Sequence, residues 1–413
     1  MANLGVELDC LEGIKIVDFT QFEAGPSCTE SLAWLGAEVV KIENPLTGDP
    51  GRRLAKPGAP DNDPWYFHQF NANKKSLTVN LKSPRGLEIV KALLAKADVT
   101  IENMAPGTIE RLGLGYDEVN KINPGIIYCQ VKGFGTGSPY EKNLAFDMIA
   151  QAAGGPTSVT GEAGQAPVKP GPSFGDTGTG MLMAISILGA LYKRAKTGQG
   201  RRLQVAMQDA MIHYMRVPFS RTQASGKAPA RGGSARSQPG GLVPSALYPC
   251  KPGGPNDYVY VFCSRANPEH WQRLLRVIGR EDLSGDERYD TQNARSQRAA
   301  EVDEIISAWT REHTKDVAMK LIGEAGVPAG AVFDTAELMA DPSLAERGIM
   351  QTFEHPTTGR VKMPAWPVRF DGAPAKVKPS PLLGQHTGEV LQGWLGMSAG
   401  EIDGLKADGV LGK

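Results

Sequence analysis

A single carboxylate, Asp176, stands out among glycines in the stretch Gly171–Met181, a turn that comes directly before the apolar run Met181–Tyr192. The run is typical of a buried helix. Glycines around the carboxylate allow close backbone approach and positive φ angles. Near a helix N-terminus, unpaired N–H groups and the helix dipole stabilise an ionised carboxylate, which makes Asp176 a candidate covalent nucleophile. Aspartate is also a common helix N-cap, so the residues alone leave both interpretations open.

Two further segments carry acidic side chains in settings that suit a ligand. Glu23 lies in the opening segment Asp18–Pro26, where a strand end, small residues and a proline-initiated helix predict a concave backbone site. Backbone N–H groups of such a site can receive a ligand oxygen. Asp147 ends the second segment, which begins at Leu144.

The common cofactor and hydrolase motifs do not occur. No GxGxxG follows the first expected strand, and neither GxxxxGK[ST] nor GxSxG is present. The six histidines show no HxH or HExxH spacing, so no metal site is expected. The five scattered cysteines lack CxxC spacing and indicate reduced thiols in a cytoplasmic protein.

Charge and hydropathy exclude two classes of partner. Lysine plus arginine and aspartate plus glutamate both total 45. The chain therefore has no excess positive charge that would favour binding to nucleic acid or to an anionic membrane. No signal peptide is evident, and no apolar run approaches the ~20 residues of a membrane span.

Strand and helix patterns alternate through the first half of the chain. The segments Pro26–Leu35 and Pro84–Ala95 are expected helices. Six segments predict strands: Ile14–Phe19, Ala37–Ile42, Ser76–Leu81, Val99–Glu102, Ile126–Lys132 and Arg202–Ala206. This alternation favours an α/β fold with a large Rossmann-like domain and a mainly parallel sheet. Helices are also expected later, near 268–278, 298–311 and 315–325, and the piece 327–370 looks strand-rich.

The length of 413 residues favours more than one domain. We expect a large α/β domain over 1–220, and a linker with a glycine-rich loop over 221–256. A small α+β domain is expected over 257–326, followed by a linker and a C-terminal part over 327–413.

Several short blocks, weak singly but specific in this order, carry a family resemblance. They are Gly13–Glu43, Asn71–Leu81, Ala97–Gly113, Phe146–Gly155, Gly175–Met181, Val205–Ala210, Gly326–Gly330, Asp341–Pro342 and Pro381–Thr387. With them the chain resembles the class III CoA-transferases, the formyl-CoA transferase and carnitine CoA-transferase group, and its pattern is nearest to the formyl-CoA:oxalate enzymes.

The resemblance implies an acyl-CoA:carboxylate CoA-transferase that uses CoA esters as substrates and no permanently bound cofactor. The residue matching Asp176 attacks the thioester, forming an aspartyl anhydride and then an aspartyl-CoA thioester. Asp147 matches an acidic residue near that nucleophile. The positions that match CoA contacts are Ala24, Val79, Lys82, Asn103, Met104 and Arg111. The resemblance further implies interlocked, ring-shaped homodimers whose large domain takes both chain termini.

Three departures from the formyl-CoA:oxalate pattern bear on the substrate. Glu23 replaces a glutamine, so it either stays protonated or meets a different acceptor. Leu144 and Phe146 replace a lysine and a tyrosine and make the pocket more apolar. The glycine loop expected to cover the site is altered, and Gly240 and Gly241 are its nearest counterparts.

The acceptor stays open among oxalate, succinate and other small carboxylates. Four arginines are candidates to hold it: Arg52, Arg53, Arg231 and Arg236. Two alternative functions are a 2-methylacyl-CoA racemase, whose histidine base would be replaced by Phe146, and a non-catalytic CoA-binding protein.

Overall fold

A computed structural model describes residues 5–54, 64–234, 236–237 and 241–412. The chain divides into two compact units. The first comprises residues 1–157, 169–227 and 342–413, and the second comprises 158–168 and 228–341. Both chain termini therefore belong to the first unit.

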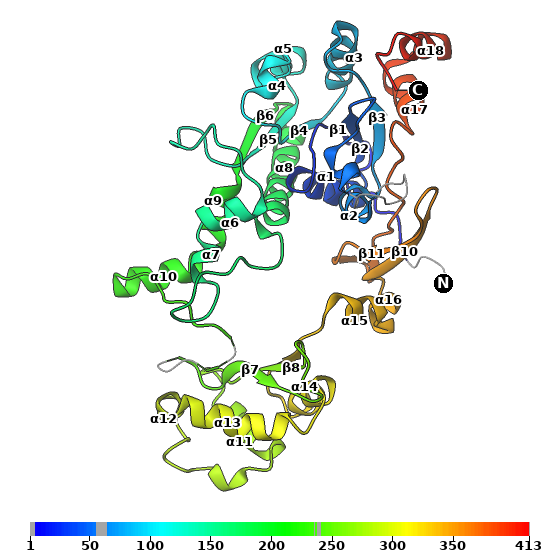
Figure 1. The fold of residues 1–413 in the computed structure, drawn as a ribbon. Coiled ribbons are helices and arrows are strands. Elements are labelled where there is room, and N and C mark those ends of the chain that lie inside the picture. Colours follow the sequence, from blue (N-terminus) through cyan, green and yellow to red (C-terminus); the bar gives the residue numbers. More distant parts are fainter. Residues whose placement is uncertain (1–4, 55–63, 235, 238–240, 413) are drawn as a thin grey trace. The chain divides into compact units, whose positions relative to one another are not determined.

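A six-stranded parallel sheet in the order β3-β2-β1-β4-β5-β6 organises the first unit (Figure 1). Its strands are β1 Lys15–Asp18, β2 Glu38–Glu43, β3 Lys75–Thr78, β4 Val99–Glu102, β5 Ile127–Lys132 and β6 Arg201–Ala206. The α/β fold and all six expected strands are confirmed. The third strand ends at Thr78, earlier than expected, because the chain turns at Asn80 into α3.

Helices pack on both faces of this sheet. The helices that contribute to its two cores are α1 Ala24–Trp34, α3 Pro84–Leu94, α4 Thr108–Arg111, α5 Tyr116–Ile122, α6 Asp147–Ala153, α8 Thr179–Thr197, α9 Met207–Tyr214, α17 Thr387–Leu395 and α18 Ala399–Ala407. The first unit also contains α2 Trp65–Asn71, α10 Arg216–Ser225 and α16 Pro342–Glu346, and the short helix α7 Pro156–Val159 begins in it and ends in the second unit. One 3₁₀ turn, η1 Pro50–Arg53, follows β2, and one π-helical turn, η2 Phe174–Gly178, precedes α8.

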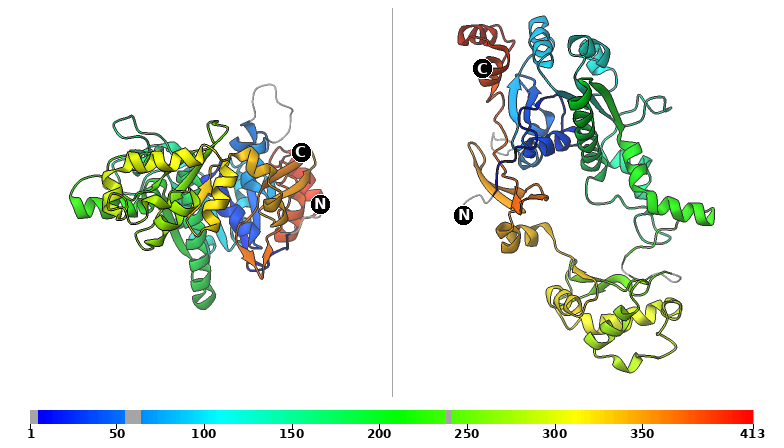
Figure 2. Two further views of the ribbon diagram at one scale, coloured as in Figure 1. Left: turned by 90° about the horizontal axis from the view of Figure 1, so that it is seen from below. Right: turned by 180° about the vertical axis from the view of Figure 1, so that it is seen from behind.

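Successive side chains of each strand point to opposite faces of the sheet and pack into two separate hydrophobic cores. Ile16 of β1 packs with α1, α6, α8 and α9, whereas its neighbour Val17 packs with α3, α4, α5, α17 and α18. The same alternation at Val39 and Val40 of β2 explains why two adjacent positions of one strand are both apolar and both buried. Figure 2 shows the C-terminal helices α17 and α18 beside α3, far away in sequence.

Helix α8 is present where the apolar run predicted a helix, but it is not buried all round. Met183 and Ile187 face the core, while Ile185 is 66% and Tyr192 68% exposed. The helical stretch 174–197 is the single one among the described residues that is long and apolar enough for a membrane span. With 44% of the tested window buried in the protein, it is weak support for such a span.

The second unit has its own core around a three-stranded antiparallel sheet, β7-β8-β9. Its elements are β7 Ser245–Pro249, β8 Tyr258–Phe262, β9 Ala329–Ala331, α11 Glu269–Val277, η3 Glu281–Leu283, α12 Gln292–Gln297, α13 Ala299–Thr310, α14 Lys315–Glu324 and α15 Thr335–Ala340. The piece 327–370 is less uniformly stranded than expected. It contains the helices α15 and α16 as well as β9 and, in the first unit, β10 Met350–His355, β11 Gly359–Pro364 and β12 Arg369–Phe370, which pairs with β13 Ala373–Pro374.

Candidate active site

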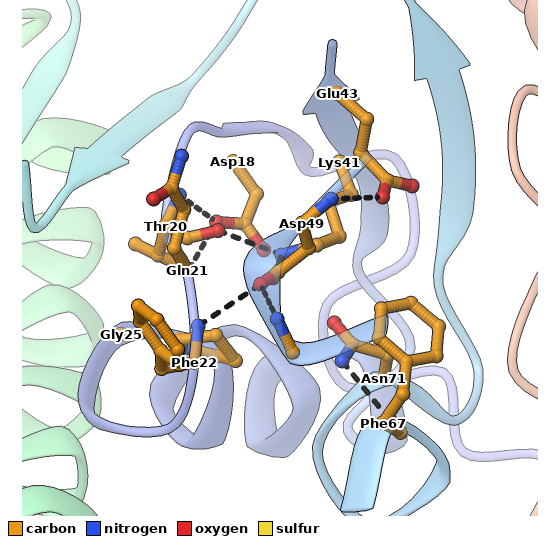
Figure 3. Close-up of polar contacts among 12 residues, drawn as sticks. Asp18, Thr20, Gln21, Phe22, Gly25, Lys41, Glu43, Asp49, Phe67 and Asn71 are labelled. Atoms are coloured by element: carbon orange, nitrogen blue, oxygen red, sulfur yellow. Dashed lines mark hydrogen bonds and ion pairs between the residues drawn. The ribbon is translucent and has the colours of Figure 1, made fainter. Parts of the chain in front are cut away.

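The loop between β1 and α1 is held by hydrogen bonds to its backbone. Asn103, just after β4, exchanges two 2.8 Å hydrogen bonds with Gln21, one with its N–H and one with its carbonyl. The Phe22 N–H donates to Asp49 Oδ1 at 3.2 Å (Figure 3). Phe22 has a φ of 61°, a left-handed backbone conformation that is energetically unfavourable for phenylalanine. These contacts therefore compensate for local strain at the residue that precedes Glu23.

Buried ion pairs lie behind this loop, at the carboxyl ends of β1 and β2. Lys41 contacts Asp49 at 2.7 Å and donates to the Thr20 carbonyl at 2.6 Å. Asp18 accepts hydrogen bonds from the Thr20 N–H and from Thr29, and it pairs with Lys74. Burial alone would raise the pKa of Asp18, but the charges of Lys74 and Lys41 outweigh it and lower that pKa. The charges in this group are paired, as burial requires.

The turn that carries Asp176 fits tightly against its neighbours. The Gly175 N–H donates to Asp147 Oδ1 at 2.9 Å, and a Cβ at Gly175 would lie 2.7 Å from the Asp147 carbonyl oxygen. At Gly180, a Cβ would lie 2.5 Å from the Ala24 carbonyl oxygen. Neither glycine has a positive φ, so close packing against neighbouring backbone requires them. Of the two reasons for glycine given by the sequence, positive φ does not apply at these positions.

Asp176 is not a helix cap. The N-cap positions are Ser173 for the π-helical turn and Gly178 for α8. The Asp176 carboxylate is half-buried and makes no side-chain hydrogen bond within the described parts of the chain. Burial raises its pKa to about 7, and the charges of Glu23 and Asp147 add to the rise.

Glu23 lies directly beside this turn, because its Oε1 accepts a 2.8 Å hydrogen bond from the Thr177 hydroxyl. Burial raises the pKa of Glu23, while hydrogen bonds from Thr177, Ser173 and Tyr66 oppose the rise. The charge of Glu23 in turn contributes to the raised pKa of Asp176.

Asp147 supports the same turn from the other side. Its carboxylate accepts from the Gly175 N–H, from Gln151 at 2.8 Å and from Lys169 at 3.2 Å. Unlike Asp176, it is buried and fully engaged.

A cavity of about 230 Å³ opens next to Asp176. Its lining residues are Gln21, Phe22, Glu23, Ala24, Asn103, Met104, Ala105, Pro106, Val131, Lys132, Gly133, Asn143, Leu144, Ala145, Phe146, Asp176 and Met207. They come from five places: the segments that follow β1, β4 and β5, the start of α9 after β6, and the π-helical turn η2, which supplies Asp176. The segments that follow parallel strands meet at one edge of the sheet.

The structure brings together only some of the residues expected at the site. Glu23, Ala24, Asn103, Met104 and Asp176 line the cavity, and Asp147 supports it from behind. The other positions expected to contact CoA lie outside the lining: Val79 is buried in a sheet core, and Lys82 and Arg111 are exposed. Gly241 belongs to the second unit, and Gly240 falls outside the described residues.

The expected acceptor arginines are not gathered at the cavity. Arg52 is buried and forms a two-pronged ion pair with Glu43, with nitrogen–oxygen distances of 2.8 and 2.9 Å. Arg231 donates to the carbonyl oxygens of Ser158 and Gln165 within the second unit. Arg53 and Arg236 are exposed, and neither lines the cavity.

Lys132 is the charged lining residue that sequence reasoning missed. Its ammonium contacts Glu102 at 2.7 Å and the Met104 carbonyl oxygen at 2.9 Å. The sequence did offer a signal for it. Lys132 ends an expected strand, as Asp18 nearly does, and residues at the carboxyl ends of parallel strands tend to line ligand sites. Across the described residues, no cluster of three or more histidine, cysteine or acidic side chains suits a metal ion.

Comparison with known proteins gives consistent matches over nearly the whole chain. Residues 11–387 match the model of CoA-transferase family III. A protein of Streptomyces coelicolor named formyl-CoA:oxalate CoA-transferase is 39% identical over 97% of this chain and 99% of its own. One of Afipia carboxidovorans with the same name is 35% identical over 98% of both. The crystal structure of a CAIB/BAIF family protein from Brucella suis superposes with a TM-score of 0.81 at 32% identity, covering 93% of this chain and 98% of the other.

Proposed function

The chain belongs to CoA-transferase family III and is an acyl-CoA:carboxylate CoA-transferase, and from this premise we propose that Asp176 is its covalent nucleophile. The observation that carries the proposal is the contrast between Asp176 and the acids around it. Asp147 and Glu23 have hydrogen-bond partners, whereas the Asp176 carboxylate has none among the described residues and faces the cavity. An acid with no partner keeps its oxygens available for attack on a bound thioester.

The proposed reaction moves CoA in four attacks without a metal ion. An Asp176 oxygen attacks the thioester carbonyl carbon, the carbon–sulfur bond breaks, and CoA leaves as the thiolate. The thiolate attacks the Asp176 carbonyl of the resulting anhydride and releases the donor as a carboxylate, leaving an aspartyl-CoA thioester. The acceptor carboxylate attacks that thioester, and CoA leaves again as the thiolate. The thiolate finally attacks the acceptor's carbonyl carbon, which yields the new acyl-CoA and free Asp176.

The neighbouring acids have different parts in this proposal. Glu23 tunes the charge at Asp176, since its own negative charge opposes ionisation of the nucleophile. Asp147 is a positioning residue that holds the turn through the Gly175 N–H. Backbone N–H groups of this glycine-rich turn are candidates to stabilise the oxyanion formed at each attack.

CoA would extend from the cavity over the first unit. Ala24, Asn103 and Met104 line the cavity and are proposed to contact the thioester end. Val79, Lys82 and Arg111 remain proposed contacts for the rest of CoA, with the two cations as phosphate ligands. Gly240 and Gly241 as a covering loop, the interlocked homodimer and the cytoplasmic location also stay predictions.

Hydroxylamine trapping tests the proposal directly. The protein is incubated with short acyl-CoAs, quenched with hydroxylamine and digested. The mass of the peptide containing Asp176 is then measured by mass spectrometry. An activated Asp176 is converted to the hydroxamate, whereas an Asp176→Asn variant gives no such mass. Absence of label with every donor, together with exchange of deuterium into the α-position of a branched acyl-CoA, would overturn the proposal in favour of a racemase.

A further inference from the structure

Apolar side chains form much of the wall of the cavity that Asp176 also lines. The rings of Phe22 and Phe146 meet edge to face, with centroids 5.9 Å apart and an interplanar angle of 86°. Phe146 is 53% exposed and Leu144 is 68% exposed, although both are large apolar residues. The remaining apolar lining residues are Ala24, Met104, Ala105, Pro106, Val131, Ala145 and Met207. Exposed apolar surface of this kind beside a reactive group suits an apolar ligand.

The charges that line the cavity do not suit a second carboxylate. Glu23 and Asp176 are the acidic lining residues, and Lys132 is the basic one. Lys132 is already paired with Glu102 and bonded to the Met104 carbonyl. In the described lining, therefore, no unpaired cation faces an anion bound near Asp176. A dicarboxylate with one carboxyl group joined to Asp176 would bring its other charge beside Glu23 and against the apolar wall, at a large desolvation cost.

We infer that the acids exchanged at Asp176 are monocarboxylates with an apolar body, and that Phe22, Leu144 and Phe146 select them. The inference rests on the proposed function, because it concerns the acyl group attached to Asp176 in the anhydride. It also separates this chain from the relatives named for oxalate, whose acid has a carboxylate in place of the apolar body.

The wall is held in place from behind. Phe22 keeps its left-handed conformation through the contacts of its N–H with Asp49 and of Gln21 with Asn103. Asp49 is in turn paired with buried Lys41. A ring supported in this way presents a preorganised apolar surface, which lowers the entropic cost of binding.

An exchange between each acyl-CoA and its own free acid measures the selectivity for one acid at a time, because donor and acceptor are then the same acid. Each acyl-CoA is mixed with its own acid carrying carbon-13, and the appearance of the label in the CoA ester is followed by mass spectrometry. We expect kcat/KM to rise from acetate through butyrate to hexanoate by about fourfold per methylene, until the cavity is filled. Exchange of oxalate with oxalyl-CoA is expected to be at least about 100-fold slower than that of butyrate.

A positive charge placed in the wall should weaken the preference for butyrate over oxalate. Leu144→Lys is expected to reduce the ratio of butyrate to oxalate exchange at least about tenfold, because it supplies the missing cation. Leu46→Lys is the matched control, since Leu46 is 91% exposed and lies outside the cavity lining. This control should leave the ratio within about twofold.

Each outcome separates the two proposals. Oxalate exchange as fast as butyrate exchange, or a ratio that Leu144→Lys does not change, would overturn the selectivity while Asp176 still formed the hydroxamate. Loss of both exchange and hydroxamate with every acid would overturn the proposed function, and the selectivity with it.

Discussion

Acidic side chains in the first unit occupy two contrasting settings. Behind the loop that follows β1, Asp18 and Asp49 are buried and bound to Lys74 and Lys41, and the pKa of Asp18 is lowered. At the cavity, Asp176 is half-buried without a partner among the described residues, and its pKa is raised to about 7. The same type of group thus stabilises the backbone in one place and stays available for reaction in the other. Both settings impose a desolvation cost on the charged carboxylate, which by itself raises its pKa. The two pKa values shift in opposite directions because a cation lies beside Asp18 and none lies beside Asp176 among the described residues.

The largest expected effect comes from the unpaired acid. Asp176→Asn should lower kcat by at least about 10³-fold, because the amide cannot form the anhydride. The fold should persist, since the variant loses no side-chain hydrogen bond. Steady-state transfer assays and thermal unfolding check both points, with the exposed Asp117→Asn as control. Activity within tenfold of the wild type would contradict the assignment.

Breaking the paired group should instead cost stability. Lys41→Met leaves Asp49 and the Thr20 carbonyl without their cation in a buried position, at a cost of about 3–5 kcal/mol. We expect the Tm to fall by about 10 °C. Lys121→Met, which removes the exposed Lys121–Glu118 pair, is the matched control and should shift the Tm by less than about 2 °C. Equal shifts in the two variants would contradict the proposed difference between these settings.

The pH dependence should report the unpaired acid. Asp176 must be ionised to attack, so kcat/KM for the acyl-CoA should rise about tenfold per pH unit below pH 7 and level off above it. Pre-steady-state or steady-state rates between pH 5 and 9 provide the profile.

Glu23→Gln sharpens this prediction, because it removes a negative charge that raises the pKa of Asp176. The acidic limb of the profile should move to lower pH. At pH 6, kcat/KM of the variant, as a fraction of its own plateau value, should exceed the same fraction for the wild type by about two- to fivefold. A limb that stays in place would show that Glu23 does not act on Asp176.

Local patterns predicted the sheet well. Val99–Glu102 was expected with the bounds it has, because apolar and polar residues alternate in this short segment. The helix after Asp176 was also correctly expected, but its exposed side was not. Ile185 and Tyr192 look like core residues in sequence, and only the three-dimensional packing shows which face of α8 meets the sheet.

The site was harder to predict, because it depends on which charges find partners. Arg52 is a plausible anion ligand by residue type, yet Glu43 at the end of β2, the strand that precedes its turn, binds it. Lys132 lines the cavity but pairs with Glu102 across neighbouring strands. Pairing of this kind follows from strand order and register, which a single sequence does not specify. The roles of Asp176, Glu23 and Asp147 and the expected CoA contacts remain predictions.

The most direct measurement of the central claim follows an oxygen atom. The protein is allowed several turnovers with butyryl-CoA and butyrate whose carboxylate oxygens are 18O, in ordinary water. In the proposed reaction, the bridging oxygen of the last anhydride comes from the acceptor and stays on Asp176. The account therefore predicts one 18O atom in the peptide containing Asp176 after the first turnover, and up to two after several, because either carboxylate oxygen can attack the next thioester. Formation of labelled butyryl-CoA with no 18O in that peptide would contradict it.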